Sequence, residues 1–335
     1  MNAISIRRPD DFHVHLRQDR LLELVLPYTA KVFARALAMP NTNPPLTKWQ
    51  EVNAYYWKVK SLGKEYGFEP IRCLYLTDNT TRDMVFTAYA LGANVCKLYP
   101  AGATTNSQQG VKDIKAIFPA LEAMEKTGMI LSVHAEKPGA FCLDAEREFL
   151  PVFWEIYCAF PKLKIVWEHV TTKELAELLK RYPDRVAATI TAHHLVLTLD
   201  DVIGNKINPH NFCKPVAKRP ADREALIQAA LSGNPKFFFG SDSAPHNLGL
   251  KENGSGNAGI YSAPVAMPLL AEIFEKRGAL DKLEDFTSRF GADFYRLPYN
   301  TGTLTLVKEP HEVPYYYDGL APFMAGAELK WRIKE

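Results

Sequence analysis

Short apolar runs recur along the chain and alternate with longer stretches whose apolar residues return at helical spacing. Several runs are apolar at every position, which is typical of parallel strands packed against helices. Because such runs are too short for helices, they predict strands. The predicted strands cover residues 12–16, 34–39, 71–76, 94–98, 130–134, 165–169, 186–190 and 237–240.

The stretches between these runs predict helices. Residues 47–66 follow a Pro-Pro turn, and residues 222–231 and 265–277 keep apolar positions at helical spacing. Thr171 and Glu174 form a capping-box pattern before an apolar stripe, so a helix is expected to begin there. Another helical pattern spans residues 114–124, where Pro119 must begin or kink the helix.

Eight strand-like runs alternating with helices favour a (β/α)8 barrel, with a doubly wound open sheet as the alternative. The polar residues favour the barrel, because only a barrel brings the carboxyl ends of all its strands to one mouth. We see no repeat or linker, so residues 1–335 are expected to form one catalytic barrel domain. The polar residues that end the runs are His13, His15, Asn41, Lys97, His134, His169 and Asp242.

Composition narrows the class of protein. Hydrophobic residues make up 47% of the chain, and 40 basic residues against 38 acidic ones give a formal charge of +2. This balance predicts neither nucleic acid nor an anionic membrane as a partner. No signal peptide or membrane-length apolar run is visible, and five scattered cysteines without a C-x-x-C pair indicate reduced thiols, so we expect a cytoplasmic protein.

The histidines at the strand ends indicate a metal site. His13 and His15 are two apart in a strand, so both imidazoles can reach one ion while Val14 packs outward. His134 and His169 end two further strands. Each histidine alone is better explained as a hydrogen-bonded core residue, but four at corresponding positions favour a metal.

Two further strand-end residues carry charge. Asp242 follows a very apolar strand and needs a partner, for which a divalent cation is suited; capping of the next turn through Ser243 is the alternative. Lys97 would repel metal ions as an ammonium. It either pairs with a carboxylate or points outward, or it is carbamylated by carbon dioxide and becomes an anion with two oxygens. Spacing does not decide between these.

Several motifs together resemble dihydroorotase, in the short, single-domain bacterial type of the amidohydrolase superfamily. The resemblance runs from about residue 6 to residue 328 in the expected order. It rests on Arg8-Pro-Asp-Asp-Phe-His-Val-His-Leu-Arg17, Met39-Pro-Asn41, Lys97-Leu-Tyr-Pro-Ala101, Val133-His134, Glu168-His169, Gly240-Ser-Asp-Ser-Ala-Pro-His246 and Ala325-Gly-Ala-Glu328.

The resemblance implies the reversible cyclisation of N-carbamoyl-L-aspartate to L-dihydroorotate, the third step of pyrimidine biosynthesis, by a homodimer with two zinc ions per subunit. It implies that His13, His15 and Asp242 hold one zinc and that His134 and His169 hold the other. Carbamylated Lys97 (N6-carboxylysine) and a hydroxide would bridge the two ions. The hydroxide would be the nucleophile, with Asp242 as general acid and base.

The resemblance also implies the substrate contacts. Arg17, Asn41 and His246 match the groups that bind the substrate carboxylate, although from the residues alone they could be a surface arginine, a turn residue and a loop histidine. Ala258 matches a main-chain contact, and Thr104 and Thr105 lie in a loop, 100–110, that closes over the substrate. Lys214 stands where the family often has an apolar residue, so its effect on the ring pocket is open. His193, His194, His210 and His311 are expected in packing or surface roles without a metal.

Two other functions compete with a dihydroorotase activity as explanations of these motifs. Other cyclic amidohydrolases, such as hydantoinases and allantoinases, usually carry extra strands before the H-x-H motif. Only twelve residues precede His13, which is too few for that subdomain. A non-catalytic scaffold is the rival from another class, but such proteins tend to lose metal ligands, and all six candidates are present.

Overall fold

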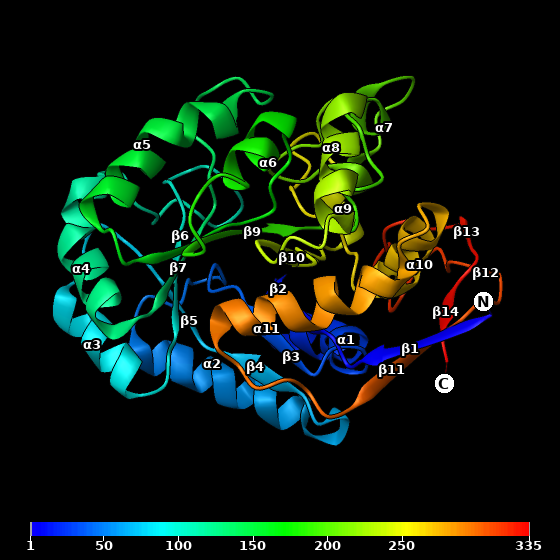
Figure 1. Ribbon diagram of the computed structural model, residues 1–335, viewed down its shortest axis with the longest axis horizontal. Helices are drawn as coiled ribbons and strands as arrows, with labels where there is room; N and C mark the ends of the chain where they lie inside the picture. The colour runs from blue at the N-terminus through cyan, green and yellow to red at the C-terminus, as the bar shows by residue number, and fades with distance from the viewer. Residues whose placement is uncertain (1, 335) are drawn as a thin grey trace.

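Parallel strands follow one another around the centre of the molecule (Figure 1). In the computed structural model, which describes residues 2–334, six strands pair in the order β10-β9-β8-β7-β6-β5 and three in the order β2-β3-β4. All of these pairs are parallel. The bounds are β2 Asp10–Val14, β3 Arg35–Ala38, β4 Glu69–Ile71, β5 Cys73–Tyr75, β6 Val95–Leu98, β7 Ile130–Val133, β8 Lys164–Trp167, β9 Val186–Ile190 and β10 Phe237–Phe239.

The two sheets belong to one closed wall. β4 and β5 are separated by Arg72 alone; the first pairs with β3 and the second with β6, so they act as one interrupted strand. The last gap closes between β2 and β10, where the amide of Asp242 donates to the carbonyl of His13 at 2.8 Å and the amide of His15 donates to Ser243 at 2.9 Å. The fold is therefore an α/β barrel with eight strand positions, and the open sheet is excluded.

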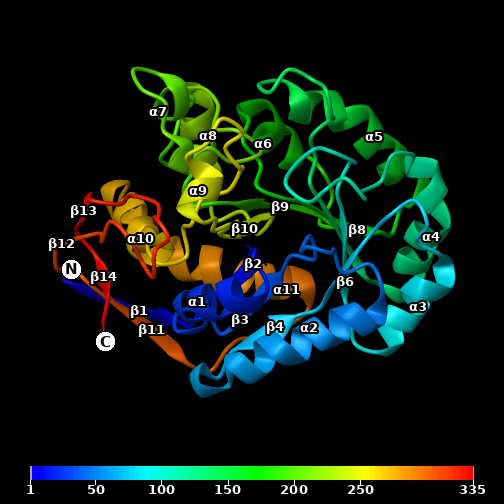
Figure 2. The same ribbon diagram turned by 180° about the vertical axis from the view of Figure 1, so that it is seen from behind.

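Helices surround this wall in both views (Figures 1 and 2). The predicted helix 47–66 is α2 followed by a 3-10 turn at Lys64–Tyr66, and Pro119 lies in the first turn of α4, where its missing N–H costs nothing. The helices are α1 Asp19–Ala30, α2 Trp49–Leu62, α3 Arg82–Ala90, α4 Phe118–Thr127, α5 Ala145–Ala159, α6 Lys173–Leu179, α7 Asp200–Ile203, α8 Pro220–Leu231, α9 Leu248–Lys251, α10 Ala266–Lys276 and α11 Phe290–Tyr295.

Two local predictions were wrong. The strand predicted at 71–76 starts earlier and is broken at Arg72. The capping box was placed one residue too early, because Thr172 caps α6 and accepts from the amide of Leu175 at 3.3 Å. Thr171 instead turns into the core, where its amide and hydroxyl both donate to Glu146.

A small antiparallel sheet stands beside the barrel. β1 (Ala3–Arg7) pairs with β11 (Thr303–Val307), which pairs with β14 (Arg332–Ile333), so the first and last strands of the chain flank β11 in one sheet. β12 (His311–Glu312) pairs with β13 (Glu328–Leu329) nearby. The residues before β2 thus add one strand to a sheet built mainly from the C-terminal chain.

Side chains inside the barrel are apolar at its amino-terminal end. Phe12 stacks on Tyr295 with ring centroids 4.6 Å apart and meets Phe238 edge-on at 5.4 Å. Val14 packs outward as predicted, yet Phe12 and His13 both point inward. The register of β2 against β3 is irregular between Asp11 and Val14, which allows two successive residues to face the interior. The apolar layer leaves only the carboxyl ends of the strands for polar chemistry.

A buried ion pair fixes the start of β2 against β3. Arg35 donates to both oxygens of Asp10 at 2.9 and 2.6 Å, and Asp10 is fully buried. We expect Asp10→Asn to lower the free energy of unfolding by about 3–5 kcal/mol in urea denaturation, because a buried guanidinium loses its counter-charge.

The control for this prediction is Glu224→Gln, which breaks the exposed pair between Glu224 and Arg277. Its effect should stay within about 1 kcal/mol. Equal losses in the two variants would show that the buried pair has no special role.

Candidate functional site

Every sequence-predicted metal ligand lies at the carboxyl ends of the strands. His13 and Lys97 are in β2 and β6, His134 directly follows β7, and His169 and Asp242 follow β8 and β10. All are buried except His15, which is partly buried. Because parallel strands in a barrel deliver these ends to one mouth, residues that are far apart in sequence meet there.

The four imidazoles form a continuous cluster. Ring centroids are 5.3 Å apart for His13 and His15, 5.0 Å for His13 and His169, and 4.8 Å for His134 and His169. Asp242 Oδ1 lies 3.0 Å from His15 Nε2 and 3.3 Å from His13 Nε2. The ligand atoms of His13, His15 and Asp242 all lie within 4.8 Å of one another, a spacing that a metal ion can bridge.

The pKa shifts of His15, His169 and Asp242 suit cation binding. Burial lowers the pKa of His15 to about 4 and that of His169 well below its usual value, so both rings are neutral and offer lone pairs. Burial would raise the pKa of Asp242, but His13 and His15 outweigh it and hold that pKa well below the ordinary range. Asp242 is therefore a carboxylate at neutral pH.

Lys97 is fully buried beside this cluster, and its Nζ has no hydrogen-bond partner among residues 2–334. Burial lowers the pKa of its ammonium, although Glu168 and Asp242 act in the opposite direction. Because its side chain is buried, Lys97 does not point outward, and within residues 2–334 it makes no ion pair with a carboxylate. Neither of the two roles expected of an unmodified lysine at this position is therefore seen.

Backbone strain marks two of the ligands. His169 and Asp242 adopt positive φ angles of 41° and 43°, a region that costs free energy for any residue with a side chain. Gly240 lies two residues before Asp242, and a Cβ at residue 240 would lie 2.9 Å from His13 Cβ. The close approach of β10 to β2 thus requires glycine at residue 240.

Two glutamates orient the imidazoles, a role the sequence did not reveal. Glu168 accepts from His13 Nδ1 at 2.9 Å and also from Ser132 and Thr189, each at 2.6 Å, so His13 presents Nε2 to Asp242. Glu136 lies 2.7 Å from His134 Nε2, which leaves Nδ1 free for an ion. A charged residue inside the apolar strand run 165–169 was the available signal for Glu168.

The predicted substrate-binding residues gather at the same mouth. Arg17 donates from Nε to the carbonyl of Pro245 at 2.9 Å, and its Nη2 lies 3.0 Å from His246 Nε2. His246 Nε2 lies 3.0 Å from the carbonyl of Ala258, an acceptor, and His246 Nδ1 lies 3.4 Å from the side-chain amide nitrogen of Asn257, a donor, so we assign the ring proton to Nε2. Arg17 and His246 therefore turn two donors toward each other, an arrangement that an anion between them would relieve.

The loop that contains Thr104 and Thr105 is closed over the cluster. Asn41 donates to the carbonyl of Thr105 at 3.0 Å, the hydroxyl of Thr105 donates to Ala258 at 3.2 Å, and the amide of Thr104 donates to Ser107. The space left around the imidazoles is about 20 Å³, room for about one water. Thr105 separates it from an outer cleft of about 300 Å³, so the loop must move before a larger molecule can enter.

Lys214 lines the inner space beside the imidazoles. Its Nζ donates to the carbonyl of Ala103 at 2.8 Å, so in this closed form the ammonium contacts the base of the loop.

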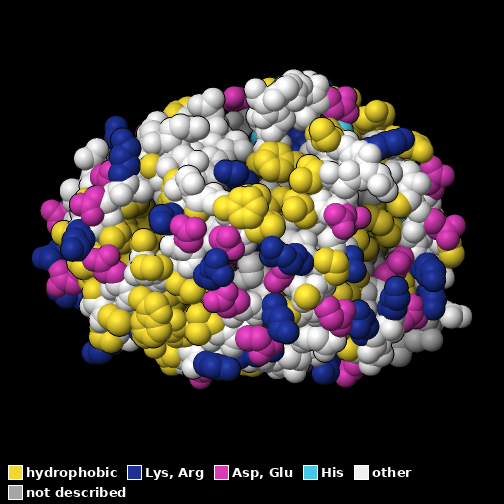
Figure 3. All heavy atoms as spheres, turned by 90° about the horizontal axis from the view of Figure 1, so that it is seen from above, with side chains coloured by type: hydrophobic (Ala, Val, Ile, Leu, Met, Phe, Trp, Pro, Cys, Tyr) yellow, Lys and Arg dark blue, Asp and Glu magenta, His cyan; other side chains and the backbone are white. Residues whose placement is uncertain are grey.

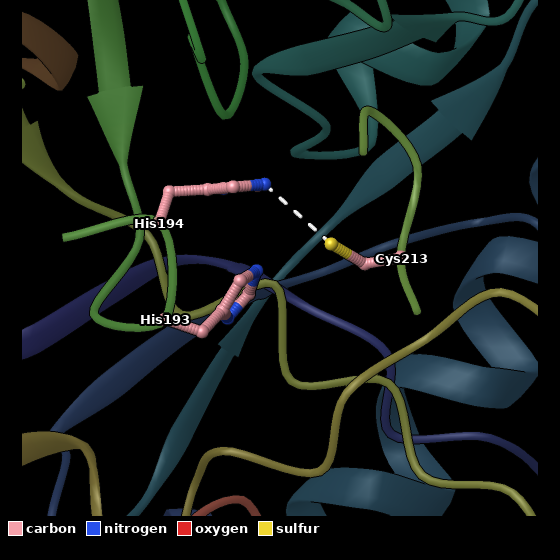
Figure 4. A group of neighbouring side chains, drawn as sticks. All are labelled: His193, His194 and Cys213. Carbon is pink, nitrogen blue, oxygen red and sulfur yellow. Dashed lines mark hydrogen bonds between the residues drawn. The ribbon is translucent and has the colours of Figure 1, made fainter. Parts of the chain in front are cut away.

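A second cluster of possible ligands lies nearby (Figure 4). The ligand atoms of His193, His194 and Cys213 lie within 4.8 Å of one another. His194 is hydrogen-bonded through Nδ1 to Thr191 and through Nε2 to the carbonyl of Pro215, as expected of a packing residue. The absence of a metal role for these histidines stays a prediction. His210 pairs with Glu252 at the surface, and His311 lies in β12.

The distribution of charged side chains on the surface agrees with the near-balance of basic and acidic residues in the sequence. Basic and acidic side chains intermingle over the face in Figure 3, without a large area of one sign. No helix within residues 2–334 is both long and apolar enough to cross a membrane.

Comparisons with known proteins identify the family. The model of the amidohydrolase family matches residues 85–310. A curated dihydroorotase of Teredinibacter turnerae is 47% identical over 342 residues, covering 100% of this chain and 99% of the relative. One of Cupriavidus necator is 48% identical, covering 99% of each. The chain belongs to the dihydroorotases of the amidohydrolase family.

Solved structures of dihydroorotases agree with this membership. The enzyme of Saccharomyces cerevisiae, in complex with 5-fluoroorotic acid, has a TM-score of 0.94 at 37% identity, covering 100% of this chain and 99% of that one. The enzyme of Campylobacter jejuni has a TM-score of 0.93 at 42% identity, covering 100% and 98%. An L-hydantoinase of Arthrobacter aurescens has a TM-score of 0.79 at 16% identity, covering 98% and 83%, which shows a shared fold alone.

Because Glu168 orients His13, we expect its charge to affect how tightly the imidazole cluster binds a metal ion. Glu168→Gln keeps the size of the side chain but removes the charge that orients His13. We expect zinc affinity, measured by competition with a chelator, to fall by about 10- to 100-fold.

Glu146→Gln is the matched control, because Glu146 is also fully buried but bonds to Trp167 and Thr171. It should destabilise the fold without changing zinc affinity. Parent-like zinc binding by Glu168→Gln would contradict the assigned role.

Proposed function

We propose that this enzyme interconverts N-carbamoyl-L-aspartate and L-dihydroorotate with two zinc ions per subunit, as the third step of pyrimidine biosynthesis. The observation that carries the proposal is the meeting of six candidate metal ligands with the Arg17–His246 donor pair at one barrel mouth. The full-length similarity to curated dihydroorotases supports it. The proposal includes a single catalytic domain, a cytoplasmic homodimer, a small-molecule substrate, and no nucleic-acid or membrane partner.

The residues fit a pair of ions. His13, His15 and Asp242 would hold one, His134 and His169 the other, and carbamylated Lys97 would bridge them. Lys97 Nζ and His169 Nδ1 are among the buried nitrogens without partners within residues 2–334, and both lie in this cluster; they support the assignment, because such atoms are costly unless something binds them. When bound, two divalent ions would lower the pKa of a coordinated water to about 7 and would polarise the amide carbonyl.

The setting of Lys97 favours carbamylation. The reaction needs a neutral amine: Nζ attacks carbon dioxide, a nitrogen–carbon bond forms, and one proton leaves. Burial lowers the pKa of the ammonium and so favours the neutral amine. The product is an anion, which replaces an unpaired buried amino group with a group that cations stabilise.

Asp242 would move the proton. In the ring-opening direction it accepts a proton from the attacking water and delivers it to the ring nitrogen as the carbon–nitrogen bond breaks. In the cyclisation direction it takes a proton from the ureido nitrogen. Its position, 3.0 Å from His15 Nε2, keeps the carboxylate ionised and aimed into the cluster.

Arg17, His246 and Asn41 would bind the substrate carboxylate. The guanidinium and the Nε2–H of His246 converge, and a carboxylate placed there would accept from both and remove the donor–donor contact. Thr105 is hydrogen-bonded to Asn41 and to the carbonyl of Ala258 in this closed form. The loop would open to admit the substrate and, on closing again, would exchange these bonds for contacts with the substrate.

A non-catalytic role is the second candidate, since an inactive dihydroorotase-like domain from Chaetomium thermophilum shares the fold at 16% identity and a TM-score of 0.71, covering 99% of this chain and 92% of that one. The convergence of all six candidate ligands argues against it here. The cyclic-amide rivals differ in the charge of their rings, and a carboxylated ring suits the cationic Arg17.

Turnover measurements test the proposed function. Purified enzyme reconstituted with zinc and bicarbonate should hydrolyse L-dihydroorotate and leave hydantoin untouched. Asp242→Asn should fold normally by circular dichroism and lose turnover, which rules out a contaminating activity. Hydrolysis of hydantoin in preference to dihydroorotate, or less than one metal ion per folded chain, would overturn the proposal.

The bridging carbamate has its own test. Lys97→Ala should lose nearly all activity, and millimolar formate or acetate should restore part of it by replacing the missing carboxylate oxygens. Lys214→Ala is the control, because its ammonium contacts only the loop backbone; added carboxylates should leave its rate unchanged. Full activity of Lys97→Ala without an additive would exclude a bridging role.

A further inference from the structure

Lys251 is a buried cation that the proposed chemistry does not use. It is the last residue of α9, which lies beside β10 in both views (Figures 1 and 2), and its side chain is 3% exposed. Its Nζ donates to three carbonyls, those of Phe212 at 3.0 Å, Asn257 at 2.8 Å and Gly259 at 2.7 Å. Every proton of the ammonium therefore has an acceptor.

No carboxylate balances this charge. Within residues 2–334, Lys251 forms no ion pair, and burial lowers its pKa to about 8. Burying an ammonium without a counter-ion is costly, and three neutral acceptors offset that cost only while all three stay in place. The converging carbonyls and the ammonium thus hold one another in a fixed arrangement.

The carbonyls belong to two segments that border the substrate pocket. Phe212 precedes Cys213 and Lys214, which line the inner space, while Asn257 and Gly259 flank Ala258. The amide of Gly259 also donates to the carbonyl of Phe212 at 2.9 Å. Through its three bonds, Lys251 ties these two segments together.

Ala258 is the residue most constrained by this tie. Its carbonyl accepts from His246 Nε2 at 3.0 Å and from the hydroxyl of Thr105 at 3.2 Å. Gly259, with a φ of 149°, is wedged so closely that a Cβ would lie 2.9 Å from His246 Nε2. A shift of residues 257–259 would therefore move His246, and with it the donor that faces Arg17.

We propose that Lys251 is a positioning residue for substrate binding, which acts by fixing the main chain of residues 257–259 and through it His246. The inference rests on the proposed function, because the carboxylated ring is what this pocket would hold. It assigns no contact between Lys251 and the substrate. A lysine is required because its three donors diverge tetrahedrally, whereas the planar guanidinium of arginine does not match three converging carbonyls.

The test is the split between KM and kcat in Lys251→Met, which keeps the length of the side chain and removes the charge and the donors. We expect KM for L-dihydroorotate to rise at least about tenfold, the loss of about one hydrogen bond to a charged group. The kcat should change little and zinc content should stay at the parent value, because the imidazole cluster is not tied to Lys251. Affinity for 5-fluoroorotic acid, measured by calorimetry, should fall in parallel.

Glu252→Gln is the matched control, since it perturbs the next residue and its exposed pair with His210 but leaves the three bonds of Lys251 intact. It should keep parent values of KM and kcat. Lys251→Arg should raise KM as Lys251→Met does, and Lys251→Gln serves in the same assay if Lys251→Met does not fold.

The outcomes separate this inference from the proposed function. Parent enzyme without activity on dihydroorotate would overturn the proposed function itself. Active parent enzyme together with an unchanged KM in folded Lys251→Met would show that the lysine only stabilises the fold. A loss of zinc or of kcat at unchanged KM would also overturn the positioning role.

Discussion

The seam between β2 and β10 is the constraint on which the rest of the structure depends. Asp11 accepts from the amide of Ser241 at 2.8 Å and from the amide of His13 at 3.1 Å, and its other oxygen accepts the hydroxyl of Ser241 at 2.5 Å. The two bonds from Ser241, with that from the amide of Asp242 to the carbonyl of His13, join residues more than 200 positions apart. They close the barrel and set Asp242 against His13 and His15 in one step.

The β2–β10 seam and the strand ends near it include conformations and buried groups that would only destabilise the fold if no ligand bound there. Asp242 is held at a positive φ, and Gly240 must lack a side chain. Across the barrel mouth in β6, the buried Lys97 has no partner among residues 2–334. Two other buried charges are paired, Asp10 by Arg35 and Lys251 by three carbonyls, although unpartnered buried atoms also occur elsewhere, as at His193. The combination of backbone strain and an unpaired charge at one barrel mouth is the usual signature of a functional site.

Much of the barrel was predictable because strand length, apolar runs and strand-end polar residues are local signals. They predicted eight strand positions and the meeting of His13, His134 and His169. The break at Arg72 was not predictable, because it depends on which neighbour each half of that strand pairs with. The cap at Thr172 was missed since the adjacent threonines differ only in that Thr171 meets Glu146, a contact across 25 residues.

The roles of Glu168, Glu136 and Lys251 were also beyond local patterns. Glu168 and Lys251 act through contacts between distant segments: Glu168 reaches His13, and Lys251 joins 212 to 257–259. Glu136 contacts His134, two residues before it, but it lies after the strand, where no strand periodicity fixes its direction. Diffraction from crystals grown with zinc and bicarbonate, measured across the zinc absorption edge, tests the central claim most directly. The account predicts two anomalous peaks, one within about 2.1 Å of His13, His15 and Asp242 ligand atoms and one at His134 and His169, with added density on Lys97 Nζ between them. A single peak, a peak away from these residues, or an unmodified Lys97 pointing away from both would contradict it.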